Sequence, residues 1–444
     1  MSTRTRPRRT TQIFCASTLY GAVTIAAAID SGRFGPADRR ILLVTDNAPV
    51  PETTPSLDEA EGFARLRGRF DSVLSWNEVI FPLHPGGWTP RASDLPLLQR
   101  HLRRIWELGD DRVELALESI QVTPALAIAQ LLPEASITVY ADGLMSYGPT
   151  RNKIDPLIGG RVSRLLHLDL VPGLAPLLLG EFGAVPEAVP AEAFTKCVEE
   201  LAGPPSGPAP AEGPALLLGQ YLAALNLLTA AEEEELHLRM VRGAVARGHR
   251  RLVFKPHPTA PDAWSRKLVR AAEELGAELT VEDRPVLAEV LYRELRPALV
   301  VGCFSTALLT AHTFYGLPVA RVGTRPLLER LTPFQNSNRI PLTVVDAVVP
   351  PLGGTEGDGA GIGTEELNDL VAAVGFAMQP KIRPELRTAA VRHLSGPAAE
   401  RTRHHFTRRR LTALGLPGGL PLPRHPQVRR LARRALRLRG ALKR

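Results

Sequence analysis

Cysteine is scarce in this sequence of 444 residues, and the three that occur, Cys15, Cys197 and Cys303, are far apart. Their number is odd and no two of them share a metal-binding spacing, so neither a disulfide framework nor a cysteine-based metal site is expected. We therefore expect a protein of a reducing cytoplasm.

Long apolar runs are also missing, because no stretch reaches the roughly 20 uninterrupted apolar residues of a membrane span. Residues 13–29 follow several arginines and imitate a secretory signal peptide. Ser17 and Thr18 interrupt this run, and it continues into Asp30 without a clear small-residue cleavage site. A first strand followed by a helix is the better interpretation.

Residues 401–444 contain no acidic residue and fourteen Lys or Arg. Their positive charge exceeds the formal net charge of the whole chain, which is +8. Residues 1–400 are therefore net acidic. Residues 428–439 can form a basic amphipathic helix, which predicts peripheral contact with the anionic inner face of the membrane. A solvated tail is the alternative. Charge alone would also permit nucleic-acid binding, but arginine is the default cation throughout this chain, so no nucleic-acid partner is expected.

Apolar strands alternate with helical segments twice along the chain, which is typical of parallel sheets covered on both faces. The predicted fold class is α/β, with two Rossmann-like domains whose parallel sheets face a central cleft. The expected units are an N-terminal acceptor-side domain (1–185), a Pro/Gly/Ala-rich linker (186–214), a C-terminal donor domain (215–380) and a basic tail, helical or disordered (381–444).

The stretch Lys255-Pro256-His257-Pro258 follows an apolar strand in the second domain. The two prolines restrict the backbone that carries the histidine. In open α/β folds, nucleotide ligands bind beyond the carboxyl edge of the sheet, where this imidazole would lie. The alternative is an ordinary turn with a surface histidine.

Two further short motifs also follow predicted strands. In Phe304-Ser305-Thr306 the hydroxyls fall at a helix start, where free backbone N–H groups attract an anion, although N-capping alone would explain them. Tyr140-Ala141-Asp142-Gly143 ends a strand of the first domain. Asp-Gly is a common turn, but Asp142 opposite a phosphate site is a candidate general base.

Together, the Tyr140–Gly143, Lys255–Pro258 and Phe304–Thr306 motifs resemble the three motifs of bacterial sialyltransferases, in their order and domain placement. The closest resemblance is to the capsule polysialyltransferase and lipooligosaccharide sialyltransferase group, over roughly residues 10–380. It implies a GT-B fold. We expect a cytoplasmic enzyme, and the basic tail predicts peripheral contact with the inner membrane face. The implied reaction is metal-independent, inverting transfer of sialic acid from CMP-sialic acid to a hydroxyl of a surface polysaccharide or lipid-linked glycan, with no cofactor.

The resemblance implies roles for individual residues. His257 would act as proton donor to the departing nucleotide, and Asp142 as the base that deprotonates the acceptor. The residues expected to bind the donor are Lys255, Pro258, Ser305, Thr306 and Gln220. Those expected to bind the acceptor are Ser17, Asn47 and Arg151. The chain departs from the family pattern at Ala141, where the first of two acids is missing, and Glu118 at the end of a neighbouring strand could substitute.

Other interpretations stay open. A CDP-glycerol glycerophosphotransferase or a Kdo transferase of a related fold could also place a histidine against a nucleotide phosphate. A non-catalytic protein that binds nucleotide sugars or glycans is compatible with Ala141. The sequence does not specify the acceptor.

Overall fold

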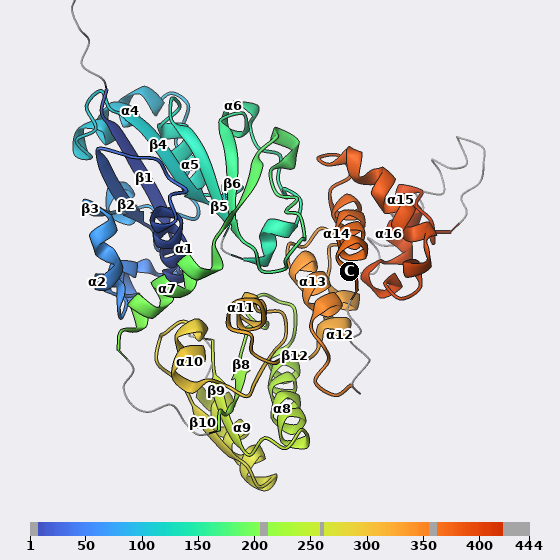
Figure 1. Ribbon diagram of the computed structural model, residues 1–444. Helices are drawn as coiled ribbons and strands as arrows, with labels where there is room; N and C mark the ends of the chain where they lie inside the picture. The colour runs from blue at the N-terminus through green and yellow to red at the C-terminus, as the bar shows by residue number, and fades with distance from the viewer. Residues whose placement is uncertain (1–7, 142, 205–211, 258–261, 355–361, 421–444) are drawn as a thin grey trace, which may run out of the picture.

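The computed structural model describes residues 8–141, 143–204, 212–257, 262–354 and 362–420. Two parallel sheets form the framework, one in each half of the chain (Figure 1). The first sheet has the order β3-β2-β1-β4-β5-β6-β7 and the second the order β10-β9-β8-β11-β12. In each sheet, strands are added on one side of the first strand, β1 or β8, and then on its other side, as in doubly wound nucleotide-binding folds. The predicted pair of Rossmann-like halves, the GT-B arrangement, is confirmed.

The strands of the first sheet are β1 (Thr10–Ala16), β2 (Arg39–Val44), β3 (Ser72–Ser75), β4 (Arg112–Glu118), β5 (Ser136–Ala141), β6 (Val162–Leu168) and β7 (Val185–Val189). Its helices include α1 (Leu19–Asp30), α2 (Phe63–Leu66), α3 (Trp76–Ile80), α4 (Leu95–Ile105), α5 (Ala125–Leu131), α6 (Pro156–Gly159) and α7 (Ala191–Ala202). Alternate residues of β1 bury on opposite faces, Ile13 in one core cluster and Phe14 in the other. Helices therefore have to cover both faces.

The strands of the second sheet are β8 (Ala215–Leu218), β9 (Arg251–Lys255), β10 (Glu278–Val281), β11 (Leu299–Gly302) and β12 (Val319–Arg321). Its helices are α8 (Ala230–Ala246), α9 (Asp262–Glu274), α10 (Ala288–Leu295), α11 (Thr306–Tyr315) and α12 (Thr324–Arg330), followed by α13 (Arg339–Val348), α14 (Thr364–Met378), α15 (Arg387–Ser395) and α16 (Arg408–Leu414). Thr229 and Glu232 form a capping box that fixes the start of α8.

The linker prediction for residues 186–214 is wrong over its first part, because strand β7 and helix α7 occupy most of residues 185–202. Phe194, Cys197, Val198 and Leu201 recur at helical spacing and are buried, and this periodicity outweighs the Pro, Ala and Gly that surround it. Helix α7 runs along the side of the first half that faces the second (Figure 1).

Helix α14 returns from the second half to the first. Its Asn368 donates from Nδ2 to the carbonyl of Gly173 at 2.8 Å and accepts from the N–H of Ala175 at 3.0 Å. Just beyond the helix, Gln379 donates to the carbonyl of Arg151 at 2.7 Å. These bonds tie the end of the second half to the loops that follow β5 and β6.

Residues 381–420 are not a free tail, because helices α15 and α16 pack against α14 (Figure 1). Buried Asp346 of α13 forms an ion pair of 2.9 Å with Arg321 and accepts from His404 at 2.7 Å. Burial opposes its ionisation, but the hydrogen bond from His404 and the charge of Arg321 lower the pKa of Asp346 to about 2. This carboxylate joins β12, α13 and the C-terminal extension.

We expect Asp346→Asn to destabilise the protein by about 3–5 kcal/mol, because it leaves the Arg321 guanidinium buried without its counter-charge. Thermal and urea unfolding measure the loss. The matched control is Asp369→Asn, which removes a pair with exposed Arg392 and should cost about 0–1 kcal/mol. Equal losses in the two variants would contradict the structural role of Asp346.

In the described part of the chain, no helix is both long enough and apolar enough to cross a membrane. The predicted basic amphipathic helix, residues 428–439, lies outside the described residues.

Candidate active site

The histidine motif lies at the carboxyl edge of the second sheet. Strand β9 ends at Lys255 because Pro256 cannot donate a ladder hydrogen bond. His257 follows, partly exposed, with its ring centroid 6.3 Å from that of Tyr221. Partial burial and the charge of Lys255 lower the pKa of His257 below its ordinary value.

The hydroxyl motif starts helix α11 at the same edge. Ser305 is the N-cap, and its Oγ accepts from the N–H of Ala307 at 3.3 Å. Thr306 is the first residue of this ten-residue helix, so the positive end of the helix dipole lies at this sheet edge. Only β8 separates β9 from β11, which places the two strand ends about 10 Å apart, or two strand spacings. A phosphate between them would meet both motifs.

Two residues predicted to bind the donor have partners within the protein. Gln220 accepts from the N–H of Phe304 through Oε1 at 2.9 Å, so it braces the turn into α11. Lys255 donates from Nζ to the carbonyl of Arg284 at 3.2 Å. Burial, opposed in part by the nearby charge of Glu282, lowers the pKa of Lys255. Donor binding by either residue stays a prediction.

The third motif comes from the first half and meets the second at α11. Strand β5 ends at Ala141, and a Cβ added to Gly143 would lie only 2.9 Å from Oγ1 of Thr306. A side chain at position 143 would therefore separate the two motifs, and glycine permits their close approach. The predicted base Asp142 and the predicted donor-binding Pro258 lie outside the described residues.

Glu118 ends β4, next to the third motif, in register with Tyr140 of β5. Its Oε2 accepts from the backbone N–H of Ser17 at 3.1 Å, from the Ser17 hydroxyl at 2.7 Å and from the Tyr140 hydroxyl at 3.5 Å. Burial raises the pKa of Glu118, although these three donors oppose the shift. A carboxyl group with a raised pKa is suited to proton exchange near neutral pH.

Two of the three predicted acceptor residues lie together. Ser17 and Asn47 line a small cavity of about 70 Å³ at the ends of β1 and β2, and Glu118 forms another part of its wall. Arg151 lies elsewhere, beside α14, where its backbone bonds to Gln121 and Gln379. Burial lowers the pKa of its guanidinium, so the environment of Arg151 disfavours its charge.

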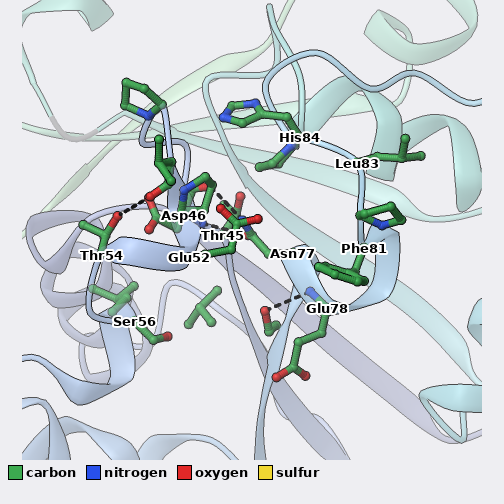
Figure 2. A pocket seen from close by; sticks show the side chains of 18 residues that line it. Thr45, Asp46, Glu52, Thr54, Ser56, Asn77, Glu78, Phe81, Leu83 and His84 are labelled. Atoms are coloured by element: carbon green, nitrogen blue, oxygen red, sulfur yellow. Dashed lines mark hydrogen bonds between the residues drawn. The ribbon is translucent and has the colours of Figure 1, made fainter.

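Sequence reasoning missed a larger cavity of about 690 Å³ beyond the ends of β2 and β3 (Figure 2). Its wall includes Asp46 and Glu52 from the loop after β2, and Glu78 and Phe81 from the segment after β3. No motif marks these residues. The sequence feature that could have indicated this cavity is the polar turn after β2, because ligands of such folds bind where strands end.

One group of described residues, Asp346, His404 and His405, lies close enough to share a metal ion. Its carboxylate already pairs with Arg321 and accepts from Thr324 at 2.6 Å. The positive charge that a metal would supply is therefore present, and we assign this group to the docking of the C-terminal extension.

Residues 12–324 match the model of the family described as alpha-2,8-polysialyltransferase (POLYST). No curated protein matches the chain.

Solved structures that are similar to this chain include three proteins from bacteria. An O-GlcNAc transferase mutant of Thermobaculum terrenum is 15% identical with a TM-score of 0.37, and the match covers 89% of this chain but only 66% of that one. The GT-B domain of a Photobacterium damselae sialyltransferase is 11% identical with a TM-score of 0.40, covering 76% of this chain and 96% of that one. A putative UDP-N-acetylglucosamine 2-epimerase of Listeria monocytogenes is 12% identical with a TM-score of 0.44, covering 91% and 95%.

The family match covers well over half of the 444 residues and includes all three motifs. The chain belongs to the alpha-2,8-polysialyltransferase family and is a sialyltransferase-like glycosyltransferase.

Proposed function

We propose that this protein transfers sialic acid from CMP-sialic acid to a glycan hydroxyl, with inversion and without a metal. The main support for the proposal is that the three motifs lie close to the start of helix α11. His257 and the Ser305-Thr306 helix start share one sheet edge, and Gly143 of the third motif lies against Thr306. Family membership supports the same reaction class.

The departing group would be CMP, whose phosphate gains negative charge as the bond to the sugar breaks. The positive end of the α11 dipole and the hydroxyls of Ser305 and Thr306 can stabilise that charge. His257 can donate a proton to the phosphate, because the anion would raise its lowered pKa once bound. Lys255 adds positive charge at the same strand end.

The attacking hydroxyl has to lose its proton as it bonds to the sugar. Asp142 is the proposed base, because it directly precedes Gly143 in the chain. Helix dipole, imidazole and ammonium together supply the positive charge that a divalent cation supplies in other transferases. The mechanism therefore requires no metal or other cofactor.

We propose a cytoplasmic location, with the basic segment 428–439 in contact with the inner membrane face. A surface polysaccharide or lipid-linked glycan under assembly would be accessible there.

A donor screen tests the assignment, with purified full-length protein, CMP-sialic acid, CDP-glycerol and CMP-Kdo as donors. We expect CMP release and transfer with CMP-sialic acid alone, at a rate that EDTA does not change. Turnover of only one of the other donors would overturn the donor assignment. Loss of activity on chelation, restored by manganese, would contradict metal independence. Binding of CMP without any turnover would indicate a non-catalytic protein.

A further inference from the structure

Arg151, in the loop between β5 and α6, is a half-buried cation without a counter-charge. Within the described ranges of the chain, its guanidinium forms no hydrogen bond and no ion pair. Burial lowers its pKa, and no neighbouring carboxylate opposes this shift. A charge that leaves water without a partner is costly, so this position is unfavourable for arginine until an anion binds.

Three other arginines in the described part of the chain have a pKa that burial lowers, and all three have partners within the protein. Arg161 and Arg339 donate to backbone carbonyls, and Arg321 pairs with Asp346 at 2.9 Å. Of these four arginines, Arg151 is the one whose donors are left for a group from outside the chain. The residue is partly exposed, and none of its nitrogens is sealed from solvent, so a ligand can reach them.

The backbone of Arg151 is fixed from both halves of the molecule. Its N–H donates to Oε1 of Gln121, in the loop after β4, at 2.5 Å, and its carbonyl accepts from Nε2 of Gln379, just beyond α14, at 2.7 Å. The preceding Thr150 is buried and accepts from the N–H of Leu179 at 3.1 Å. A ligand would therefore meet a guanidinium on a preorganised backbone, which lowers the entropic cost of binding.

Arg151 lies next to the proposed acceptor residues, although it does not line their cavity. Gln121, which holds its N–H, directly precedes Val122, and Val122 lines the small cavity together with Glu118. The loop that carries Arg151 leaves the third motif through a short 3-10 helix, Leu144–Tyr147. The position is therefore on the acceptor side, whereas the CMP phosphate is assigned to the second half.

The cations near Arg151 also lack acidic partners. Lys153 and Lys381 are two of only six lysines in the chain, both are exposed, and neither forms an ion pair with a described acid. Lys381 lies two residues beyond Gln379. The acid of the loop, Asp155, uses its side chain to cap α6. The local field therefore favours an anionic ligand.

A planar guanidinium with free donors matches a carboxylate, which can accept two parallel hydrogen bonds from it. A carboxylate is also the group that distinguishes a sialic acid from a neutral sugar. We propose that Arg151 binds a carboxylate of the acceptor glycan and thereby selects acceptors that carry an acidic sugar. Selection of acceptors rests on the proposed function, but carboxylate binding does not, because it needs no donor.

The test combines variants of Arg151 with two forms of one ligand. Full-length protein without nucleotide is titrated with a short α2,8-linked oligosialic acid, and with the same oligosaccharide after its carboxylates are converted to primary amides. We expect wild-type protein to bind the acid at least tenfold more tightly than the amide. Arg151→Met keeps the apolar stem and should weaken binding of the acid at least tenfold, with binding of the amide unchanged. Arg151→Lys keeps the charge but not the planar fork, so its affinity for the acid should be intermediate.

The matched control is Arg104→Met, the same substitution at an exposed position of α4. It should bind both ligands as wild type does, and circular dichroism checks that each variant is folded. Equal weakening of both ligands in Arg151→Met would indicate a structural role and overturn the proposal. So would wild-type protein that does not bind the acid or does not prefer it, and an Arg151→Met variant that binds the acid normally.

The donor provides a further control. Arg151→Met should bind CMP and CMP-sialic acid as wild type does. Loss of affinity for CMP-sialic acid but not for CMP would show that the guanidinium serves the donor, and would overturn the assignment to the acceptor. Failure of the donor screen with the oligosaccharide results intact would overturn only the proposed reaction.

Discussion

His257→Ala is expected to lower the rate of CMP release from the sugar donor by roughly 2–4 orders of magnitude, the usual scale for an acid-base group. The residue follows the last position of β9 and lies partly in solvent, so its loss removes little packing. Helix α11 stays in place through Ser305, and substrate affinity should change far less than turnover. Steady-state kinetics of donor hydrolysis and transfer measure both effects.

His249→Ala provides the control, because His249 precedes the same strand at its opposite end. Its rate should equal that of wild type.

Proton uptake on CMP binding gives a second measurement of the role of His257. The pKa of free His257 is lowered by partial burial and by Lys255, so part of the protein lacks this proton near neutral pH. A bound phosphate raises the pKa again, and calorimetry of CMP binding in two buffers should detect a proton taken up by wild type but not by His257→Ala. Equal uptake in both would place the titrating group elsewhere.

The alternation of strands and helices could be predicted because every strand of a covered parallel sheet has to be apolar on both faces. The same reasoning failed for β7, whose sequence Val-Pro-Glu-Ala-Val is short and contains a proline, as an edge strand permits. It also missed the docking of residues 381–420. That docking depends on Asp346, an acid inside a helix that pairs with Arg321 and His404 from distant segments.

The candidate site, like the fold, could be predicted from the sequence only in part. Residues that directly follow an apolar strand, such as His257 and Ser305, could be located because parallel strands bring their carboxyl ends to one edge. Phe81 could not, because it directly follows the short helix α3 and lines a cavity only together with the loop that faces it. Nor does the sequence reveal that Gln220 braces the turn into α11, a contact across 84 positions.

The second large effect concerns the two carboxylates near Gly143. We expect Asp142→Asn to lower transfer by roughly 2–4 orders of magnitude and Glu118→Gln to lower it by about tenfold or less. The reason for the difference is the set of bonds made by Glu118. Its Oε2 holds the backbone and hydroxyl of Ser17, and a glutamine oxygen can accept the same bonds. Glu118 then acts as a positioning residue for the turn that starts α1.

Glu118→Ala separates positioning from chemistry. Loss of the carboxylate releases Ser17, so this variant should raise the acceptor KM more than it lowers kcat, while the glutamine variant stays close to wild type.

The dependence of kcat on pH is an independent test, because burial raises the pKa of Glu118. If Glu118 were the base, the acidic limb of kcat would report this raised value, and Glu118→Gln would abolish the limb along with most of the activity. A tolerant Asp142→Asn together with an inactive Glu118→Gln would show that the base has moved one strand along the sheet, in compensation for Ala141. Because the two substitutions are isosteric, their opposite outcomes cannot both come from a general loss of folding.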